Sequence, residues 1–145
     1  MIVQNTGQVG IVFAGERSEL ILSASRELKR LGYSLPESSL ADEIFFKALN
    51  DWRETLGLQE LEFVDPLSLR LLGIEVGGDE LVLLASCAEA IPDASERYGF
   101  CRAAVKGAKE MSVSLTKYLM SKGSEPIKPS ADSMRCAVIA ALITR

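Results

Sequence analysis

The longest uninterrupted helical pattern in the chain runs from Asp93 to Gly123, and it constrains the fold more than any other feature. Asp93 precedes Ala94 and Ser95, and Glu96 follows three positions later, which is typical of a helix N-terminus. No residue ends the pattern before Gly123, so it predicts roughly 29 helical residues, or about 43 Å at 1.5 Å per residue. The other predicted elements are interpreted in relation to this long helix.

The first half of this predicted helix carries small side chains where leucines would fill more space. Read as heptads, Cys101 and Ala108 fall in one row, and Ala104 and Met111 fall in the next. A neighbouring backbone can therefore approach closely. Gly99 costs about 0.5 to 1 kcal/mol relative to alanine in a helix interior, which indicates that something packs there. Two occupants remain open: a strand of the sheet, or the same helix in a second copy of the chain.

The first 57 residues predict a strand followed by two amphipathic helices. The run QVGIVFAG at 8–15 predicts a buried strand, with Ile2 and Val3 as a candidate pairing partner. Residues 16–33 show apolar spacing typical of a helix that ends at Gly32. A second helix is expected after Pro36 with Ser39 as its N-cap, ending at Gly57. Its predicted buried stripe recurs every four residues and consists of Leu40, Ile44, Ala48, Trp52 and Leu56.

The middle of the chain changes to short apolar runs that predict strands. These runs are LEFV at 61–64, SLRLLGIEV at 68–76 and ELVLLAS at 80–86. Gly78 and Asp79 separate the last two runs, which predicts a tight β-hairpin. Its expected core face alternates along the first strand and consists of Arg70, Leu72, Ile74 and Val76.

The last apolar run, MRCAVIAALI at 134–143, fits a helix or an edge strand equally well by periodicity. Ser130, followed by Ala131 and Asp132, favours a capped helix. The stripe expected to be buried in that helix consists of Val138, Ile139, Leu142 and Ile143. Taken together, these patterns predict an α+β fold in which a small, mainly antiparallel sheet packs against two amphipathic helices and one long helix in the C-terminal half. A length of 145 residues predicts a single globular domain over 1–145.

The absence of histidine excludes several kinds of catalysis within this chain. Ser-His-Asp and Cys-His hydrolysis both need an imidazole. The three cysteines are scattered without a Cys-x-x-Cys pair, so neither a metal site nor a cofactor is predicted, and Cys101 is expected to be a buried thiol with a raised pKa. Ser114 and Lys117 match a Ser-x-x-Lys spacing, but the partner motifs of that chemistry are missing. We therefore predict no catalytic residues, and an enzyme is the third interpretation.

Charge is distributed unevenly along the chain. Residues 1–93 hold 16 of the 20 acidic residues, whereas residues 94–145 hold 9 of the 16 basic residues. Arg102, Lys106 and Lys109 lie away from the apolar stripe of the long helix and predict a basic ridge. This ridge is either a solvated helix face or a docking surface for an acidic protein partner or the acidic half of another subunit.

Two short stretches, LGYSL at 31–35 and CRAAVKGAKEM at 101–111, resemble segments of a family of subunits from vesicle-tethering complexes and of related small-molecule-binding domains. The resemblance implies an α/β fold with a long helix packed on a small sheet. It assigns no functional residue to this chain.

These observations predict a non-enzymatic protein–protein interaction or assembly module that forms a homodimer or a subunit of a larger complex. The interaction candidates lie on the long helix and are Cys101, Ala104, Ala108, Met111, Arg102, Lys106 and Lys109. The alternative is a sensory domain that binds a small apolar ligand in a pocket between the long helix and the sheet. The residues expected to line that pocket are Phe100, Ala104, Met111 and Tyr118.

Other partners and locations are less favoured by the composition. A pI near 5.0 and few aromatic residues do not favour a nucleic-acid partner. The N-terminal sequence does not match a signal peptide, and the longest apolar stretch is shorter than a membrane span. A cytoplasmic location is therefore expected.

Overall fold

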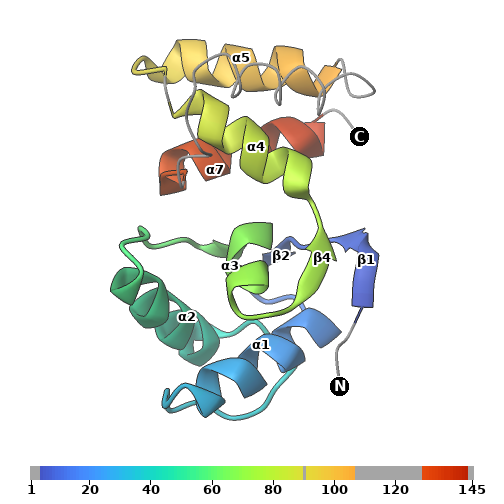
Figure 1. Cartoon of the computed structure of the whole chain (residues 1–145), viewed down its shortest axis with the longest axis vertical. Helices are drawn as coiled ribbons and strands as arrows, with labels where there is room; N and C mark the ends of the chain where they lie inside the picture. The colour runs from blue at the N-terminus through green and yellow to red at the C-terminus, as the bar shows by residue number, and fades with distance from the viewer. Residues whose placement is uncertain (1–3, 90, 107–128, 144–145) are drawn as a thin grey trace. The chain divides into compact units, whose positions relative to one another are not determined.

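The computed structural model describes residues 4–89, 91–106 and 129–143. Within these ranges the chain is mainly helical, with six helices and four short strands (Figure 1). This agrees with an α+β fold in the broad sense. Backbone contacts divide the chain into two compact units, Met1–Gly78 (unit 1) and Asp79–Arg145 (unit 2). The expectation of a single domain stays a prediction, because this division does not decide whether the two units fold together.

The strands of unit 1 form two separate pairs. Strand β1 (Gln4–Val9) pairs in parallel with β4 (Glu75–Gly77), and β2 (Val12–Phe13) pairs antiparallel with β3 (Phe63–Val64). The prediction of one small, mainly antiparallel sheet is therefore correct only for β2 and β3, because the strands form two separate pairs and β1 and β4 are parallel. Three helices and two strands lie between β1 and β4 in the sequence. Parallel strands need a long crossover connection of this kind. The pairing therefore could not be recognised from apolar runs that are neighbours in the sequence.

The strand predicted over 8–15 is divided between β1 and β2. Gly10 lies at the division, and a Cβ atom at this position would lie 2.5 Å from Cγ2 of Val76. Glycine therefore allows the chain to pass close to β4 before β2 begins. The candidate partner residues Ile2 and Val3 lie outside the described residues.

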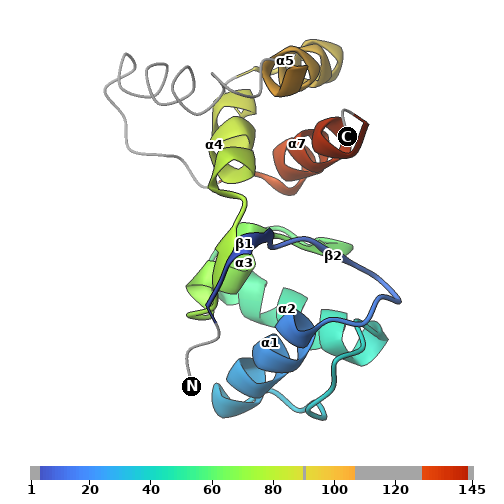
Figure 2. The ribbon, with the colours of Figure 1, turned by 90° about the vertical axis from the view of Figure 1, so that its right-hand side faces the viewer.

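Helix α1 (Glu19–Arg30) confirms the first amphipathic helix. The N–H of Leu20 donates to Oγ of Ser18 at 3.1 Å, which caps the helix start. Beyond the C-terminus, Gly32 adopts a left-handed φ of 104°, as its position predicts. Both ribbon views show α1 and α2 on the same side of the unit 1 strands (Figures 1 and 2).

Helix α2 (Glu43–Thr55) begins later than predicted. Its N-cap is Asp42, whose Oδ1 accepts from the N–H of Phe45 at 2.9 Å, so the assignment of Ser39 was wrong. The stripe repeating every four residues was also partly wrong, because Ile44 is 52% exposed and Leu56 is 36% exposed. In a helix of 3.6 residues per turn, residues four positions apart differ in direction by about 40°. Over several steps this difference adds up, so the residues at the two ends of the stripe no longer point to the buried side. The buried residues are Phe45, Ala48, Leu49, Trp52 and Arg53.

The predicted β-hairpin is absent, because helices occupy the beginning of its first strand and all of its second. Helix α3 (Pro66–Leu71) covers residues 68–71 of the first run and β4 covers 75–76, whereas α4 (Asp79–Ala88) covers the whole second run. Asp65 caps α3, and Pro66 stands at the first helical position, which is a helix-start signal that outweighs the apolar alternation. The second run is rich in leucine and alanine, which are strong helix formers. Leu72, Ile74 and Val76 are nevertheless buried, as expected for the predicted core face.

Unit 2 contains three described helices that contact one another pairwise: α4, α5 (Ala94–Lys106) and α7 (Ala131–Ile143) (Figure 2). The start of the predicted long helix is confirmed, because the N–H of Glu96 donates to Oδ1 of Asp93 at 2.9 Å. Its remainder beyond Lys106 lies outside the described residues. None of the helices within the described ranges is long and apolar enough to cross a membrane.

The final segment is a helix, so the edge-strand alternative is wrong. Oγ of Ser130 accepts from the N–H of Ser133 at 3.2 Å, which is the predicted N-cap contact. Val138 is buried as expected, whereas Ile139 is 46% exposed and lies on the outer face. Adjacent residues in a helix point about 100° apart, so a stripe of consecutive residues cannot be buried throughout.

Candidate functional site

The interaction residues predicted from the sequence lie partly within the described structure. Cys101 is buried in unit 2, and Arg102 next to it is exposed. Ala104 and Lys106 belong to α5, but their side chains lie outside the described part of the structure, as do Ala108, Lys109 and Met111. The pocket expected for a small apolar ligand is represented only by Phe100, which is half-buried, and by the backbone of Ala104.

Three cysteines from three helices lie within unit 2 as free thiols. Burial raises the pKa of the Cys101 thiol to about 12, and the neighbouring thiols of Cys136 and Cys87 add to this effect while Arg97 opposes it. Burial also raises the pKa of Cys87 and of Cys136. The thiols are therefore protonated at neutral pH and poor nucleophiles. Among the residues that the structure describes, no group of three or more Cys, Asp or Glu side chains is arranged to hold a metal ion.

The outer face of α5 combines small side chains with a cation. Gly99 and Ala103 are exposed, and a Cβ atom at Gly99 would meet no described atom within 4 Å. The guanidinium carbon of Arg102 lies 5.9 Å from the centre of the Tyr98 ring, which is within the range of a cation–π contact. We predicted that small residues of this helix let a neighbouring backbone approach closely. At Gly99 no described neighbour does so, and the position lies on an open surface.

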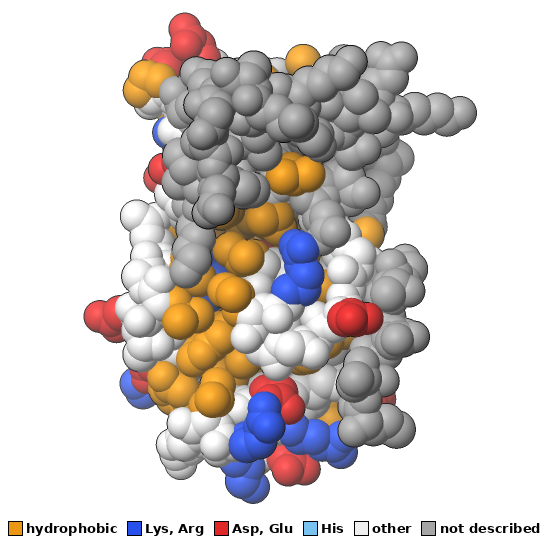
Figure 3. Space-filling model, in the orientation of Figure 1, with side chains coloured by type: hydrophobic (Ala, Val, Ile, Leu, Met, Phe, Trp, Pro, Cys, Tyr) orange, Lys and Arg blue, Asp and Glu red, His pale blue; other side chains and the backbone are white. Residues whose placement is uncertain are grey.

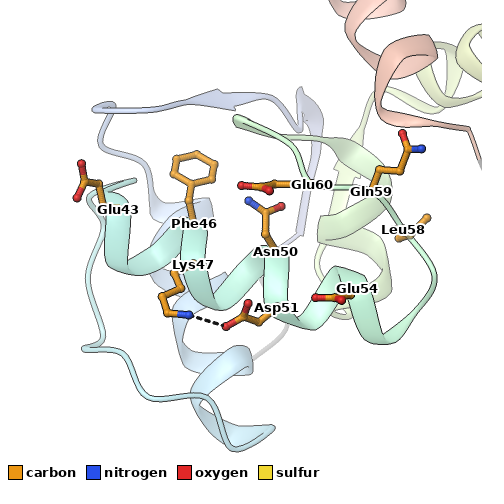
Figure 4. Close-up of a pocket in the computed structure, with 9 residues that line it drawn as sticks. All are labelled: Glu43, Phe46, Lys47, Asn50, Asp51, Glu54, Leu58, Gln59 and Glu60. Atoms are coloured by element: carbon orange, nitrogen blue, oxygen red, sulfur yellow. Dashed lines mark hydrogen bonds and ion pairs between the residues drawn. The ribbon is translucent and has the colours of Figure 1, made fainter.

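A groove that the sequence did not predict lies along α2 in unit 1 and encloses about 720 Å³. Figure 4 shows its lining, with six side chains from α2 on one wall and three residues from the following loop on the other. These residues are Glu43, Phe46, Lys47, Asn50, Asp51, Glu54, Leu58, Gln59 and Glu60. The α2 positions recur at the spacing of one helix face, so their common orientation follows from the helix itself.

Hydrogen bonds from α2 hold the loop wall in place. The side-chain amide of Asn50 donates to the carbonyl of Leu61 at 2.9 Å and accepts from the N–H of Leu61 at 3.0 Å. Nε of Arg53 donates to the carbonyl of Gln59 at 3.0 Å. Because three of the loop's polar backbone groups are bound to side chains of α2, the groove has a defined width.

A buried ion pair between Arg53 and Asp65 lies next to the loop that forms the second wall of the groove. Nη1 of Arg53 lies 3.2 Å from Oδ1 of Asp65 and also donates to Oγ of Ser68. Oδ1 of Asp65 accepts from the N–H of Ser68 at 3.3 Å as well. Arg53 and Asp65 are 1% and 0% exposed, so the pair is shielded from solvent. It fixes the end of α2 to the start of α3, and the loop that forms the groove wall lies between them in sequence.

The groove is lined mainly by acidic and polar side chains, with two apolar ones among them. Four carboxylates, those of Glu43, Asp51, Glu54 and Glu60, line it together with a single lysine. Nζ of Lys47 lies 3.2 Å from Oδ2 of Asp51, so this positive charge is already shared with one of the carboxylates. Leu58 is buried and Phe46 is half-buried, and the two lie at opposite ends of the groove (Figure 4). Such a groove attracts a positively charged group and offers apolar contact to the carbon atoms that carry it.

Large hydrophobic side chains are also exposed elsewhere, and Figure 3 shows orange side chains gathered on part of the face in view, next to charged ones. The most exposed described examples are Val9, Leu31, Ile44, Leu56, Leu71 and Ile139. None of them lines the groove. Exposed hydrophobic residues are common on protein surfaces, and nothing in the described part of the structure shows what would cover these, so we assign them no site.

Comparison with known proteins gives no family for this chain. No protein-family model matches it, and no curated protein or solved structure matches it either. The function must therefore be argued from the residues themselves.

Proposed function

We propose that this chain is a non-enzymatic protein–protein interaction module, and that its α2 groove docks a basic segment of a partner protein. The observation that carries this proposal is the pair of exposed carboxylates, Glu43 and Glu54, that line the groove along α2 together with the half-buried ring of Phe46. A segment with apolar side chains flanked by lysine or arginine complements such a surface in both charge and hydrophobicity.

Two further features support an interaction module over the other interpretations. The chain has no histidine, and the described thiols have raised pKa values, so catalysis by an imidazole or a thiolate is not favoured. The sensory-domain alternative stays untested, because Met111, Tyr118 and the side chain of Ala104, which were expected to line its pocket, lie outside the described residues. The three free thiols agree with a cytoplasmic location, which remains part of the proposal.

Two synthetic helical peptides of equal length test the proposal. Both carry a leucine stripe, which is flanked by lysines in one peptide and by glutamates in the other. Fluorescence anisotropy should show saturable binding of the lysine peptide only, with an affinity that falls as salt is raised. The double variant Glu43→Lys/Glu54→Lys should weaken binding roughly tenfold, since each reversed groove charge contributes about 0.5 to 1 kcal/mol.

The matched control is Glu37→Lys/Glu75→Lys, which changes the net charge equally at two exposed positions of unit 1 outside the groove. We expect it to leave the affinity within about twofold. Equal binding of both peptides, or an equal loss of affinity in the control, would contradict docking in the groove.

A further inference from the structure

We infer that the segment docked by the α2 groove is the outer face of α5 in a second copy of this chain. This inference rests on the proposed function of the groove and names its partner. It joins the acidic groove of unit 1 in one copy to a basic helix of unit 2 in another. The chain would then carry both halves of its own interface.

Charge complementarity is the first argument for this partner. α5 itself carries Arg97, Arg102 and Lys106 against the single acid Glu96, within a segment, residues 94–145, that holds 9 of the 16 basic and 4 of the 20 acidic residues. Arg102 is exposed on α5, whereas the groove presents the exposed carboxylates of Glu43 and Glu54. A guanidinium can form two parallel hydrogen bonds with one carboxylate, so Arg102 suits such a groove better than a lysine would.

The shape of α5 is the second argument. Gly99 and Ala103 are exposed and lack bulk, so the helix backbone can approach the groove more closely than a helix with large outer side chains. The groove follows α2 from Glu43 to Glu54, about 17 Å at 1.5 Å per residue. The 13 residues of α5 span about 20 Å, so the helix is long enough to contact the whole groove.

The contact between Arg102 and Tyr98 is the third argument. The ring supports the guanidinium at 5.9 Å on the helix surface, which reduces the side-chain entropy lost when the arginine binds a carboxylate. Tyrosine and arginine are also the residue types that most often dominate binding at protein interfaces. The half-buried Phe46 in the groove provides apolar surface for the tyrosine ring.

Sedimentation of the full chain tests this inference. At about 0.1 M salt the wild-type chain should sediment with the mass of two or more copies, and at about 0.5 M salt it should shift toward one copy. The groove variant Glu43→Lys/Glu54→Lys and the face variant Arg102→Glu should each weaken self-association about tenfold or more. Arg26→Glu on the exposed side of α1 is the control and should change nothing.

Mixing the two variants gives the sharpest result. The Arg102→Glu chain keeps an intact groove, and the Glu43→Lys/Glu54→Lys chain keeps an intact α5 face. An equimolar mixture should therefore form a 1:1 complex even though each variant alone does not associate. Recovery of the complex also shows that both variants are folded.

A wild-type chain that remains monomeric, or a mixture that does not associate, overturns the inference. Failure of this inference can be distinguished from failure of the proposed function. If the monomeric chain still binds the lysine peptide through the groove, the docking function holds and only the identity of the partner is wrong. If the peptide does not bind either, both proposals fail.

Discussion

Arg53 joins three segments of unit 1 through one side chain. It binds the carbonyl of Gln59, the carboxylate of Asp65 and the hydroxyl of Ser68, although the side chain lies at an almost fully buried position. A buried charge of this kind is retained only where its partners satisfy it, and removing one partner leaves the other uncompensated. The geometry of the groove therefore depends on a residue that does not line it.

The variant Arg53→Met tests how much this buried side chain contributes to the stability of unit 1. The variant leaves the Asp65 carboxylate buried without its cation, and we expect unit 1 to lose about 3 to 5 kcal/mol of unfolding free energy. The double variant Arg53→Met/Asp65→Asn removes both charges and should be less destabilised than the sum of the two single variants. Urea unfolding followed by the fluorescence of Trp52 measures both effects. Strictly additive losses would show that the two side chains do not interact.

Glu89 provides a second test at the residue scale, in unit 2. Its carboxylate accepts from Oγ of Ser133 at 2.6 Å and from the N–H of Ser130 at 3.0 Å, so it links the end of α4 to the start of α7. Burial alone would raise the pKa of Glu89, but these hydrogen bonds and the charge of Arg97 lower it below 4.5. The lowered pKa means that the ionised form stabilises the folded state.

The variant Glu89→Gln should therefore be less stable at neutral pH, by about 1 kcal/mol for hydrogen bonds to a partly exposed charged group. The stabilisation by ionised Glu89 is complete above its unfolded-state pKa near 4.5 and is lost as pH falls through the lower folded-state pKa. Thermal unfolding of both proteins from pH 7 to pH 3 should show the difference shrinking in the acid range. A difference that is independent of pH would contradict this assignment.

Two glycines differ in whether their surroundings tolerate a side chain, which can be tested by replacing each with alanine. Gly78 adopts a φ of 109°, and a Cβ atom there would lie 2.7 Å from Cγ of Pro66. Gly78→Ala should therefore destabilise the protein by about 1 to 3 kcal/mol. Gly99 lies inside α5 with no described atom within 4 Å of its Cβ position, so Gly99→Ala should stabilise it by about 0.5 to 1 kcal/mol.

Urea unfolding of both glycine variants in about 0.5 M salt measures these changes while docking between charged surfaces is screened. Opposite signs are expected for the same chemical substitution. If Gly99→Ala is destabilising under these conditions, its Cβ position is not open in solution.

Helix termini were the part of the fold most accessible from the sequence. Asp93 and Ser130 were correctly identified as N-caps because a capping side chain acts within three residues of itself. The hairpin prediction failed because the short apolar runs at 68–76 and 80–86 fit either secondary structure by periodicity. For the run at 68–76, the N-cap residue Asp65 and the proline after it were the signals that would have favoured a helix over a strand.

Contacts between distant segments could not be predicted in the same way. The pairing of β1 with β4 joins residues about 70 positions apart, and no local pattern encodes it. The groove was missed for a related reason. Its polar α2 face is visible in the spacing of Glu43, Lys47 and Asp51, but its second wall depends on the contact of Asn50 with the backbone of Leu61.

At the scale of the whole molecule, the sequence places separate probes in the two units. Trp52 is the single tryptophan, and it is buried in unit 1. All three cysteines belong to unit 2, where Cys87 and Cys101 are buried. Tryptophan fluorescence therefore reports unfolding of unit 1, and thiol labelling reports unfolding of unit 2.

We predict that the two probes will give the same unfolding midpoint in urea. Units of fewer than 80 residues bury a small fraction of their surface and are marginally stable alone, so a single cooperative transition is expected for a chain of 145 residues. The measurement compares Trp52 fluorescence with pulse labelling of the buried thiols across one urea series. Separate midpoints would show that Met1–Gly78 and Asp79–Arg145 are independent domains, and would replace the expectation of a single domain over 1–145.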